Sequence, residues 1–282
     1  MSYQPSPLRL QREAARRRAS HRSTLIAIIS TVVIGTALTI IVTGAPGFKL
    51  VKQSFFSPHY MKSAFPHVLS GLWLNLRVLL VAGTFVLILG LLIALARTSH
   101  SPVLYPLRLI ATIYTDIFRG LPLLLVLLLV GFGLPGLGIS WIPKSAVVLG
   151  TISLILTYSA YVAEVIRAGI EAVNPAQRMA GRALGLTQSQ TQRYVVLPQA
   201  LRKVTPPLLN DMVSLQKDSG LISVLGAIDA IRSAQIETAL SFNFTPYVVA
   251  GALFVALTIP LTRFTDWLTR KQDRARVQQG QW

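Results

Sequence analysis

The chain has 282 residues, of which 27 are Lys or Arg and 10 are Asp or Glu, so its formal net charge is +17. Hydrophobic residues make up 52% and charged residues only 13%, with a mean hydropathy of +0.56, whereas about a quarter of a soluble domain is charged. This composition excludes an ordinary soluble domain and predicts an all-α integral membrane protein, and the absence of cysteine excludes a disulfide framework and thiolate metal sites.

Residues 1–23 form a basic tail in front of the first apolar run, residues 24–43. A run of about 20 apolar residues crosses about 30 Å of hydrocarbon and is longer than the apolar core of a cleaved secretory signal. We therefore expect an uncleaved extra transmembrane helix at 24–43 and a cytoplasmic tail at 1–23. The tail is interpreted as a solvated orientation signal, with a surface-bound amphipathic helix as the alternative.

Five further segments bring the expected number of transmembrane helices to about six. The third span contains Gly120 and Pro122, which should break or kink its helix. The fifth span is so polar that a hydropathy window would nearly reject it. The five segments are residues 68–96, 103–131, 146–166, 206–228 and 246–268.

The positive charges orient these spans. On a soluble protein such an excess would suggest nucleic acid, but here Lys and Arg lie mostly between or beyond the apolar runs, as the positive-inside rule expects. We therefore expect no nucleic-acid partner. Six spans place the tail at 1–23, the turn with Arg97, the loop at 168–205 and the tail at 269–282 together in the cytoplasm. Lys49, Lys52 and Lys62 lie on the opposite side. They reduce the difference in positive charge between the two sides without reversing it.

Polar side chains in the third and fourth spans are candidates for a translocation path. Asp116 and Arg119 are three residues apart and therefore share a helix face. Glu164 lies late in the fourth span. Ionisable residues inside a membrane usually face a pathway or a partner, and a structural ion pair inside the bundle is the alternative.

The fifth span carries a polar face at helical spacing, formed by Asn210, Ser214 and Lys217. Lys217 lies roughly 18 Å from the cytoplasmic start of that helix at 1.5 Å per residue, which is near the membrane midplane. A lone charge there costs at least about 3 kcal/mol. This face is therefore a second candidate for the path.

The loop between the fourth and fifth spans has the local signals of two short helices. Asn174 is a suitable N-cap, and Gln177 three residues later completes a capping box. Gly185 suits the left-handed position that ends this first helix. Thr187 and Gln190 form a second capping box.

The second short helix should stop at Leu197, because Pro198 disfavours helical geometry in the residue before it. A connection between two spans needs only a few residues. A capped pair of helices is therefore interpreted either as a surface for a cytoplasmic partner or as a loop that packs on itself, and local chemistry leaves both interpretations open.

The segment AGRALGLTQSQTQRYVVLP at 180–198 resembles the EAA coupling loop of ABC importer permeases. That loop has a small pair, here Ala180 and Gly181, a glycine four residues later, here Gly185, and an aliphatic-x-Leu-Pro ending, here closing with Leu197 and Pro198. The flanks resemble the polar amino acid uptake branch of the family, and the likeness covers about residues 63 to 267. The flanking segments are residues 69–78, 113–129, 160–177, 197–210 and 217–226.

The chain departs from the family pattern inside this motif. Met179 replaces the usual acidic residue at its head, and Gly181 replaces the second alanine, with Arg178 and Arg182 on either side. The ion pair that the acidic residue would make is absent, so charge complementarity at the ATPase groove is expected to differ. Ser219 is followed by Gly220, where the family often has a second hydroxyl residue.

The resemblance implies a type I importer permease fold in a bacterial inner membrane, with residues 63–268 as the permease domain and 170–203 as its coupling loop. It also implies two ATP-binding subunits, a second permease subunit, identical or related, and an extracytoplasmic binding protein. The chain has no G-x-x-x-x-G-K-[ST] phosphate loop, so we expect no enzyme activity and no cofactor on this chain, with ATP and Mg on the partner ATPase.

Two groups of residues follow from the resemblance and from the polar faces. A path with both charge signs suits a polar amino acid, which carries an ammonium and a carboxylate. The expected coupling residues are Arg178, Met179, Ala180, Gly181, Gly185, Leu197 and Pro198, and the expected path residues are Asp116, Arg119, Glu164, Asn210, Ser214, Lys217, Asp218 and Ser219.

Two other functions are weighed against an ATP-driven amino acid importer. A secondary transporter driven by an ion gradient would use the intramembrane charges as ion sites, but it gives no reason for the capped cytoplasmic loop. A membrane-embedded enzyme would need a catalytic or metal-binding set, and no H-E-x-x-H spacing occurs. We therefore expect no metal site. The four histidines lie outside the centres of the expected spans and are His21, His59, His67 and His100.

Overall fold

A computed structural model describes residues 7–99 and 101–278, and every regular element in those residues is a helix. The all-α prediction is therefore confirmed. The chain divides into two compact units, residues 1–56 and 57–282.

The first unit consists of α1 (Pro7–Gly44) and the short α2 (Phe48–Phe55). The stretch Ser23–Gly44 of α1 is long and apolar enough to cross a membrane, and it contains the expected first span. The helix already begins at Pro7, so most of the expected basic tail is helical. Residues 1–6 of that tail, like 279–282 of the C-terminal tail and His100, lie outside the described residues.

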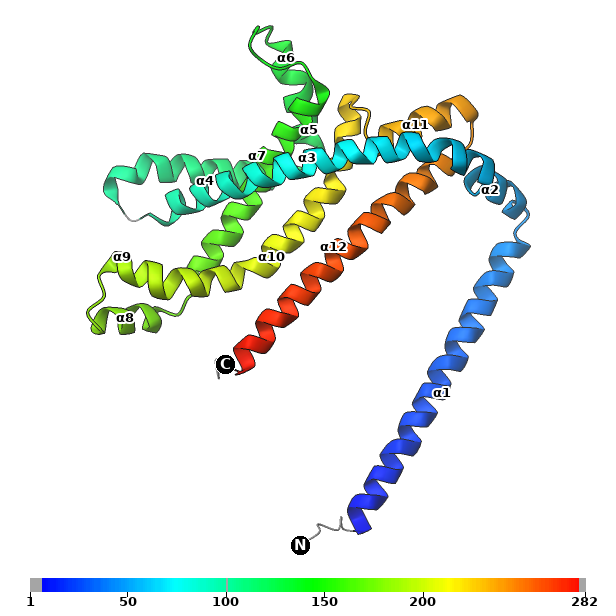
Figure 1. The fold of residues 1–282 in the computed structure, drawn as a ribbon, viewed down its shortest axis with the longest axis horizontal. Helices are drawn as coiled ribbons and strands as arrows, with labels where there is room; N and C mark the ends of the chain where they lie inside the picture. The colour runs from blue at the N-terminus through cyan, green and yellow to red at the C-terminus, as the bar shows by residue number, and fades with distance from the viewer. Residues whose placement is uncertain (1–6, 100, 279–282) are drawn as a thin grey trace. The chain divides into compact units, whose positions relative to one another are not determined.

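The second unit opens with α3 (Pro58–Thr98), which contains the expected span at 68–96 and begins ten residues before it. Pro58 occupies the first turn, where a missing backbone N–H costs nothing. The helix then passes through Pro66 without ending. In Figure 1, α3 lies across α7 (Ala146–Glu171) and beside α11 (Ala230–Ser241).

The third expected span is broken where Gly120 and Pro122 predict it. α4 ends at Gly120, α5 starts at Leu123, and the two halves are bent by 108°. The expected single span is therefore a broken pair of helices. Its elements are η1 (Pro102–Leu104), α4 (Tyr105–Gly120), α5 (Leu123–Leu128), the π-helical turn η2 (Leu129–Gly133) and α6 (Leu134–Gly136).

The helix that carries the fifth expected span begins before it. α10 runs from Leu197 to Asp218 and passes through Pro206 and Pro207, whereas residue 206 was expected to begin the span. The helix then tightens into the 3₁₀-helix η4 (Ser219–Leu225), which ends at Gly226 with φ of +89°. The sixth span, 246–268, lies within α12 (Thr245–Gln278).

Among the described helices, four segments are long and apolar enough to cross a membrane, and the bent pair is a possible fifth. α10 is not among them because polar and charged residues interrupt it, so its crossing of the membrane stays a prediction. The four segments are Ser23–Gly44, Phe48–Thr98, Ala146–Glu171 and Thr245–Lys271.

A buried polar junction joins α3 to the start of α11. Asn75 is buried, and its Nδ2 donates to the Ser219 carbonyl at 3.0 Å and to Oδ2 of Asp229 at 3.1 Å. Its Oδ1 accepts from the backbone N–H of Ala230 at 3.1 Å. Asp229 in turn caps α11 by accepting from the backbone of Arg232. Asn75 thus gives three buried polar groups the hydrogen bonds that burial would otherwise deny them.

Candidate functional site

The loop between α7 and α10 folds as two short helices, α8 (Pro175–Ala183) and α9 (Gln188–Thr191), which lie side by side at the ends of α7 and α10 (Figure 1). Asn174 caps α8 as expected. Its Oδ1 accepts from the backbone of Ala176 at 2.9 Å, whereas the backbone of Gln177 bonds to the Asn174 carbonyl. The expected box between Asn174 and Gln177 is therefore not formed, because the cap closes one residue earlier.

The turn between the two helices is built on Gly185, which has φ of +85°. The Gly185 N–H bonds to the Arg182 carbonyl and the Leu186 N–H bonds to the Gly181 carbonyl at 3.2 Å. This pair of bonds closes a helix with a left-handed residue, as the sequence predicts. Gly181 is buried against α9, where a Cβ would lie 3.2 Å from Cγ2 of Thr191. Glycine in place of the family's alanine at this position therefore lets α8 and α9 pack closely.

The capping box of α9 is confirmed, with Gln190 N–H to Oγ1 of Thr187 at 3.3 Å and Thr187 N–H to Oε1 of Gln190 at 2.9 Å. The expected stop at Leu197 is wrong. Leu197 has helical angles of −60° and −45°, and the chain continues into α10. A π-helical turn (η3, Gln192–Val196) precedes it, and the wider turn accommodates the ring and missing donor of Pro198.

This hairpin is attached firmly to α7 and α10. Nη2 of Arg178 on α8 donates to the Ile170 carbonyl of α7 at 2.7 Å, while Nζ of Lys203 on α10 donates to the Ala172 carbonyl and so ties α10 to the end of α7. A small core packs beneath it, formed by Ile170, Val173, Val196 and Ala200. A force on the hairpin would therefore reach both long helices.

The outer side of the hairpin exposes large apolar side chains. Met179 is 65% exposed and Leu184 is 84% exposed. Ala180, Arg182 and Pro198 are also exposed, whereas Arg178 is half-buried. Neither α8 nor α9 contains an acidic residue. The surface thus offers apolar contacts with a positive rim, which fits a partner groove of apolar or acidic character.

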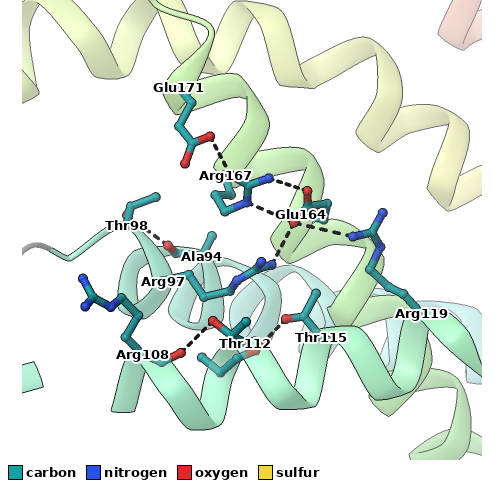
Figure 2. Close-up of polar contacts among 11 residues, drawn as sticks. Ala94, Arg97, Thr98, Arg108, Thr112, Thr115, Arg119, Glu164, Arg167 and Glu171 are labelled. Atoms are coloured by element: carbon teal, nitrogen blue, oxygen red, sulfur yellow. Dashed lines mark hydrogen bonds and ion pairs between the residues drawn. The ribbon is translucent and has the colours of Figure 1, made fainter. Parts of the chain in front are cut away.

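A second polar cluster surrounds Glu164. Figure 2 shows Arg97, Arg119 and Arg167 converging on its carboxylate from α3, α4 and α7. Arg97 donates to Oε2 at 2.7 Å, while Arg119 lies 3.6 Å away. Arg167 reaches both oxygens of Glu164 and also pairs with Glu171. Glu164 therefore links three helices, which favours the structural ion pair that the sequence left open.

The polar face of α10 is formed as expected. Asn210 and Lys217 are exposed and Ser214 is half-buried. Asp116 lies exposed on α4, on the same helix as Arg119. The two remaining path candidates turn into the unit: Asp218 accepts a 2.6 Å hydrogen bond from the Tyr158 hydroxyl, and Ser219 is buried with its hydroxyl bonded to the Gln216 carbonyl.

Several partners in these clusters were missed from the sequence. Arg167 lies at i+3 from Glu164 and i+4 to Glu171, a spacing that sequence alone could have marked. Arg97, Tyr158 and Asn75 carry no such signal, because their partners lie 67, 60 and at least 144 residues away.

A family model for inner membrane components of binding-protein-dependent transport systems matches residues 87–274, which includes the hairpin, the Glu164 cluster and α10. The chain belongs to this family.

The curated relatives of this chain are named as permease proteins of amino acid transport systems. The arginine transport system permease protein ArtQ of Bacillus subtilis (strain 168) is 36% identical over 209 residues, covering 73% of this chain and 92% of ArtQ. The probable glutamine ABC transporter permease protein GlnM of the same organism is 34% identical, covering 70% and 88%.

Solved structures of ABC transporters also resemble this chain. A crystal structure of an amino acid ABC transporter with histidines has a chain 37% identical to this one, with a TM-score of 0.69 and coverage of 75% and 96%. A bacterial ABC transporter for alginate import, 16% identical with a TM-score of 0.60, shares the fold over 93% of this chain and 99% of its own. The type I ABC importer permease fold is thereby confirmed.

Proposed function

We propose that this chain is the permease subunit of an ATP-driven importer of polar amino acids. It works with two ATP-binding subunits, a second permease subunit and an extracytoplasmic binding protein. ATP and Mg bind to the ATPase chains, and this chain carries no catalytic residue, cofactor or metal. The amino acid names of relatives that are 34–36% identical over most of their length support the substrate class.

The hairpin of α8 and α9 is the ATPase-coupling element. The observation that carries this assignment is an exposed apolar surface, Met179 and Leu184, on a hairpin that is bonded to α7 through Arg178 and packed on α7 and α10 through the small core beneath it. When ATP closes the ATPase dimer, the rigid attachment passes the movement to both helices. The spans then alternate between inward-open and outward-open arrangements.

The polar face of α10 lines the translocation path. Asn210, Ser214 and Lys217 are accessible on one side of that helix. Lys217 would attract the substrate carboxylate, and Asp218 would supply the opposite charge near the ammonium. Asp116 on α4 lies along the cytoplasmic half of this path, Glu164 holds Arg97, Arg119 and Arg167 in place beside it, and Ser219 supports its far end.

Both termini lie in the cytoplasm in this proposal, on the side of the hairpin. Arg97 and Arg167 at the ends of α3 and α7 belong to this side, as the positive-inside rule expects. A binding protein then approaches from the other side, where α11 lies.

The coupling assignment is tested with Leu184→Asp and a matched control, Leu240→Asp. Leu184 is 84% exposed on the hairpin and Leu240 is 76% exposed on α11. The importer is purified in mild detergent, and the co-purifying chains are identified by mass spectrometry. We expect the ATPase to be retained by the wild type and by L240D and to be lost from L184D.

Transport measurements on the same preparations decide whether ATP hydrolysis or an ion gradient drives uptake. In proteoliposomes holding ATP, with binding protein outside, uptake of a labelled arginine, glutamine or histidine is expected. A chain that purifies without an ATPase and accumulates amino acid from an ion gradient in ATP-free vesicles would establish the secondary-transporter alternative instead.

The path is tested with Lys217→Ala, with Lys144→Ala in an exposed loop as the control. K217A should reduce uptake while the ATPase still co-purifies, and K144A should transport normally. Unchanged uptake by K217A would show that the charge is structural.

A further inference from the structure

Two arginines bracket the apolar part of α3. The 19 residues from Val78 to Ala96 carry no charged side chain, and Arg77 and Arg97 stand at their ends. At 1.5 Å per residue, these arginines are about 30 Å apart along the helix, which matches the thickness of the hydrocarbon core. Arg77 therefore lies at headgroup level in the leaflet opposite to that of Arg97.

The two arginines differ in their partners. Arg97 pairs with Glu164 at 2.7 Å and is 11% exposed. Arg77 is exposed and makes no hydrogen bond or ion pair with any residue that the structure describes. Its guanidinium lies 5.5 Å from the ring centroid of Trp73, which is 54% exposed. Tryptophan is enriched at membrane interfaces, and an exposed guanidinium beside it is free to bind an anionic headgroup from outside this chain.

An apolar groove has Arg77 near one end. It is an open groove between α3 and the first half of α7, with a volume of about 510 Å³. Arg77 is its only charged lining residue. Its single hydroxyl, on Thr151, is already bonded to the Val147 carbonyl at 2.7 Å. The other lining residues are Leu74, Val78, Val81, Phe85, Val147, Val148, Ile152 and Ile155.

The groove has a direction. On α3 the lining runs from Leu74, one turn before Arg77, to Phe85, about 16 Å at the rise of a helix, and on α7 it runs from Val147 to Ile155. Both helices run the same way here, because their later parts meet at Arg97 and Glu164. The groove therefore descends from the headgroup level of Arg77 into the hydrocarbon.

We propose that this groove is a phospholipid site, with the lipid phosphate bound to Arg77 and one acyl chain lying between Phe85 and Ile152. A guanidinium suits a phosphate because it donates several hydrogen bonds in a planar fork. The apolar lining offers no donor or acceptor to a water-soluble ligand. The site does not depend on transport activity, and only its placement in the extracytoplasmic leaflet rests on the proposed orientation.

The test is lipid binding by the purified, delipidated importer, measured by native mass spectrometry. The probes are phosphatidylglycerol, phosphatidylethanolamine and a diacylglycerol with the same chains but no phosphate. We expect one bound phospholipid per permease chain and much weaker binding of diacylglycerol. Binding of phosphatidylglycerol should weaken roughly tenfold in Arg77→Gln, since hydrogen bonds to charged groups are worth that much, and should persist in Arg77→Lys.

Two more variants separate the site from general effects on the protein. Ile152→Trp fills the groove but keeps Arg77, so it should also lose the lipid. Lys62→Gln removes an exposed charge from the same helix outside the groove and should bind normally. If diacylglycerol binds as well as phosphatidylglycerol and R77Q changes nothing, the groove holds only unspecific membrane lipid. If R77Q separates two permease chains and leaves lipid binding unchanged, Arg77 faces a second copy, and the proposal is wrong.

Discussion

Nη2 of Arg178 donates a 2.7 Å hydrogen bond to the carbonyl of Ile170, which joins α8 to the last turn of α7. Arg178→Ala removes this bond and leaves the hairpin held by the small core beneath it. We expect the ATPase to remain bound and to hydrolyse ATP, with fewer substrate molecules imported per ATP. The ratio of uptake to hydrolysis in proteoliposomes measures this.

The control is Arg182→Ala on the same helix, an exposed side chain without a hydrogen bond to another described residue. It removes the same charge without breaking the attachment. An equal effect of R178A and R182A would mean that charge, rather than the bond to Ile170, matters.

Gly185 is the left-handed residue of the hairpin. A β-branched residue there costs about 1–2 kcal/mol, whereas asparagine tolerates this geometry better. Hydrogen exchange of the Leu186 amide, which bonds to the Gly181 carbonyl, should accelerate in Gly185→Val and remain closer to wild type in Gly185→Asn. Gly136→Val, at a glycine with ordinary φ and open space around it, should leave that amide unchanged.

Alanine substitutions at two glycines of α3 are expected to have opposite effects on stability. A Cβ on Gly71 would lie 2.4 Å from the backbone carbon of Asp229, whereas one on Gly83 would lie 3.6 Å from Sδ of Met212. Gly71→Ala should lower the melting temperature in detergent, because overpacking against backbone costs about 1–3 kcal/mol. Gly83→Ala should be neutral or slightly stabilising, since alanine is the better helix former. Equal melting temperatures would contradict the close approach of α3 to the α11 cap.

Glu164 neutralises Arg97 and Arg167. Glu164→Gln should destabilise the protein by roughly 1–3 kcal/mol, because it leaves half-buried cations without their counter-ion. Arg119→Gln, which removes a partner that is 40% exposed and 3.6 Å away, should cost less than about 1 kcal/mol. Thermal unfolding in detergent compares them, and a larger loss for R119Q would reverse the assigned order of the two contacts.

Features that depend on neighbouring residues were predictable. The box of Thr187 with Gln190, the left-handed Gly185 and the break at Gly120 and Pro122 all form as the sequence indicates. Each rests on the conformational preference of one residue or on a hydrogen bond within three residues. The stop at Leu197 failed although it used the same kind of rule, because a π-helical turn offered the proline an alternative to ending the helix.

The sequence by itself determined that this protein is an all-α membrane protein with a capped two-helix loop, because composition, apolar runs and short motifs are local properties, and its resemblance to a family of permeases added the function. Only the tertiary structure decided which side chains meet. Glu164 pairs with Arg97, which lies 67 residues away in the sequence, and Arg178 bonds to the last turn of α7. Arg77 lies near one end of an apolar groove. Such pairings follow from the packing of one helix against another, and the spacing of residues along a single helix contains no record of that packing.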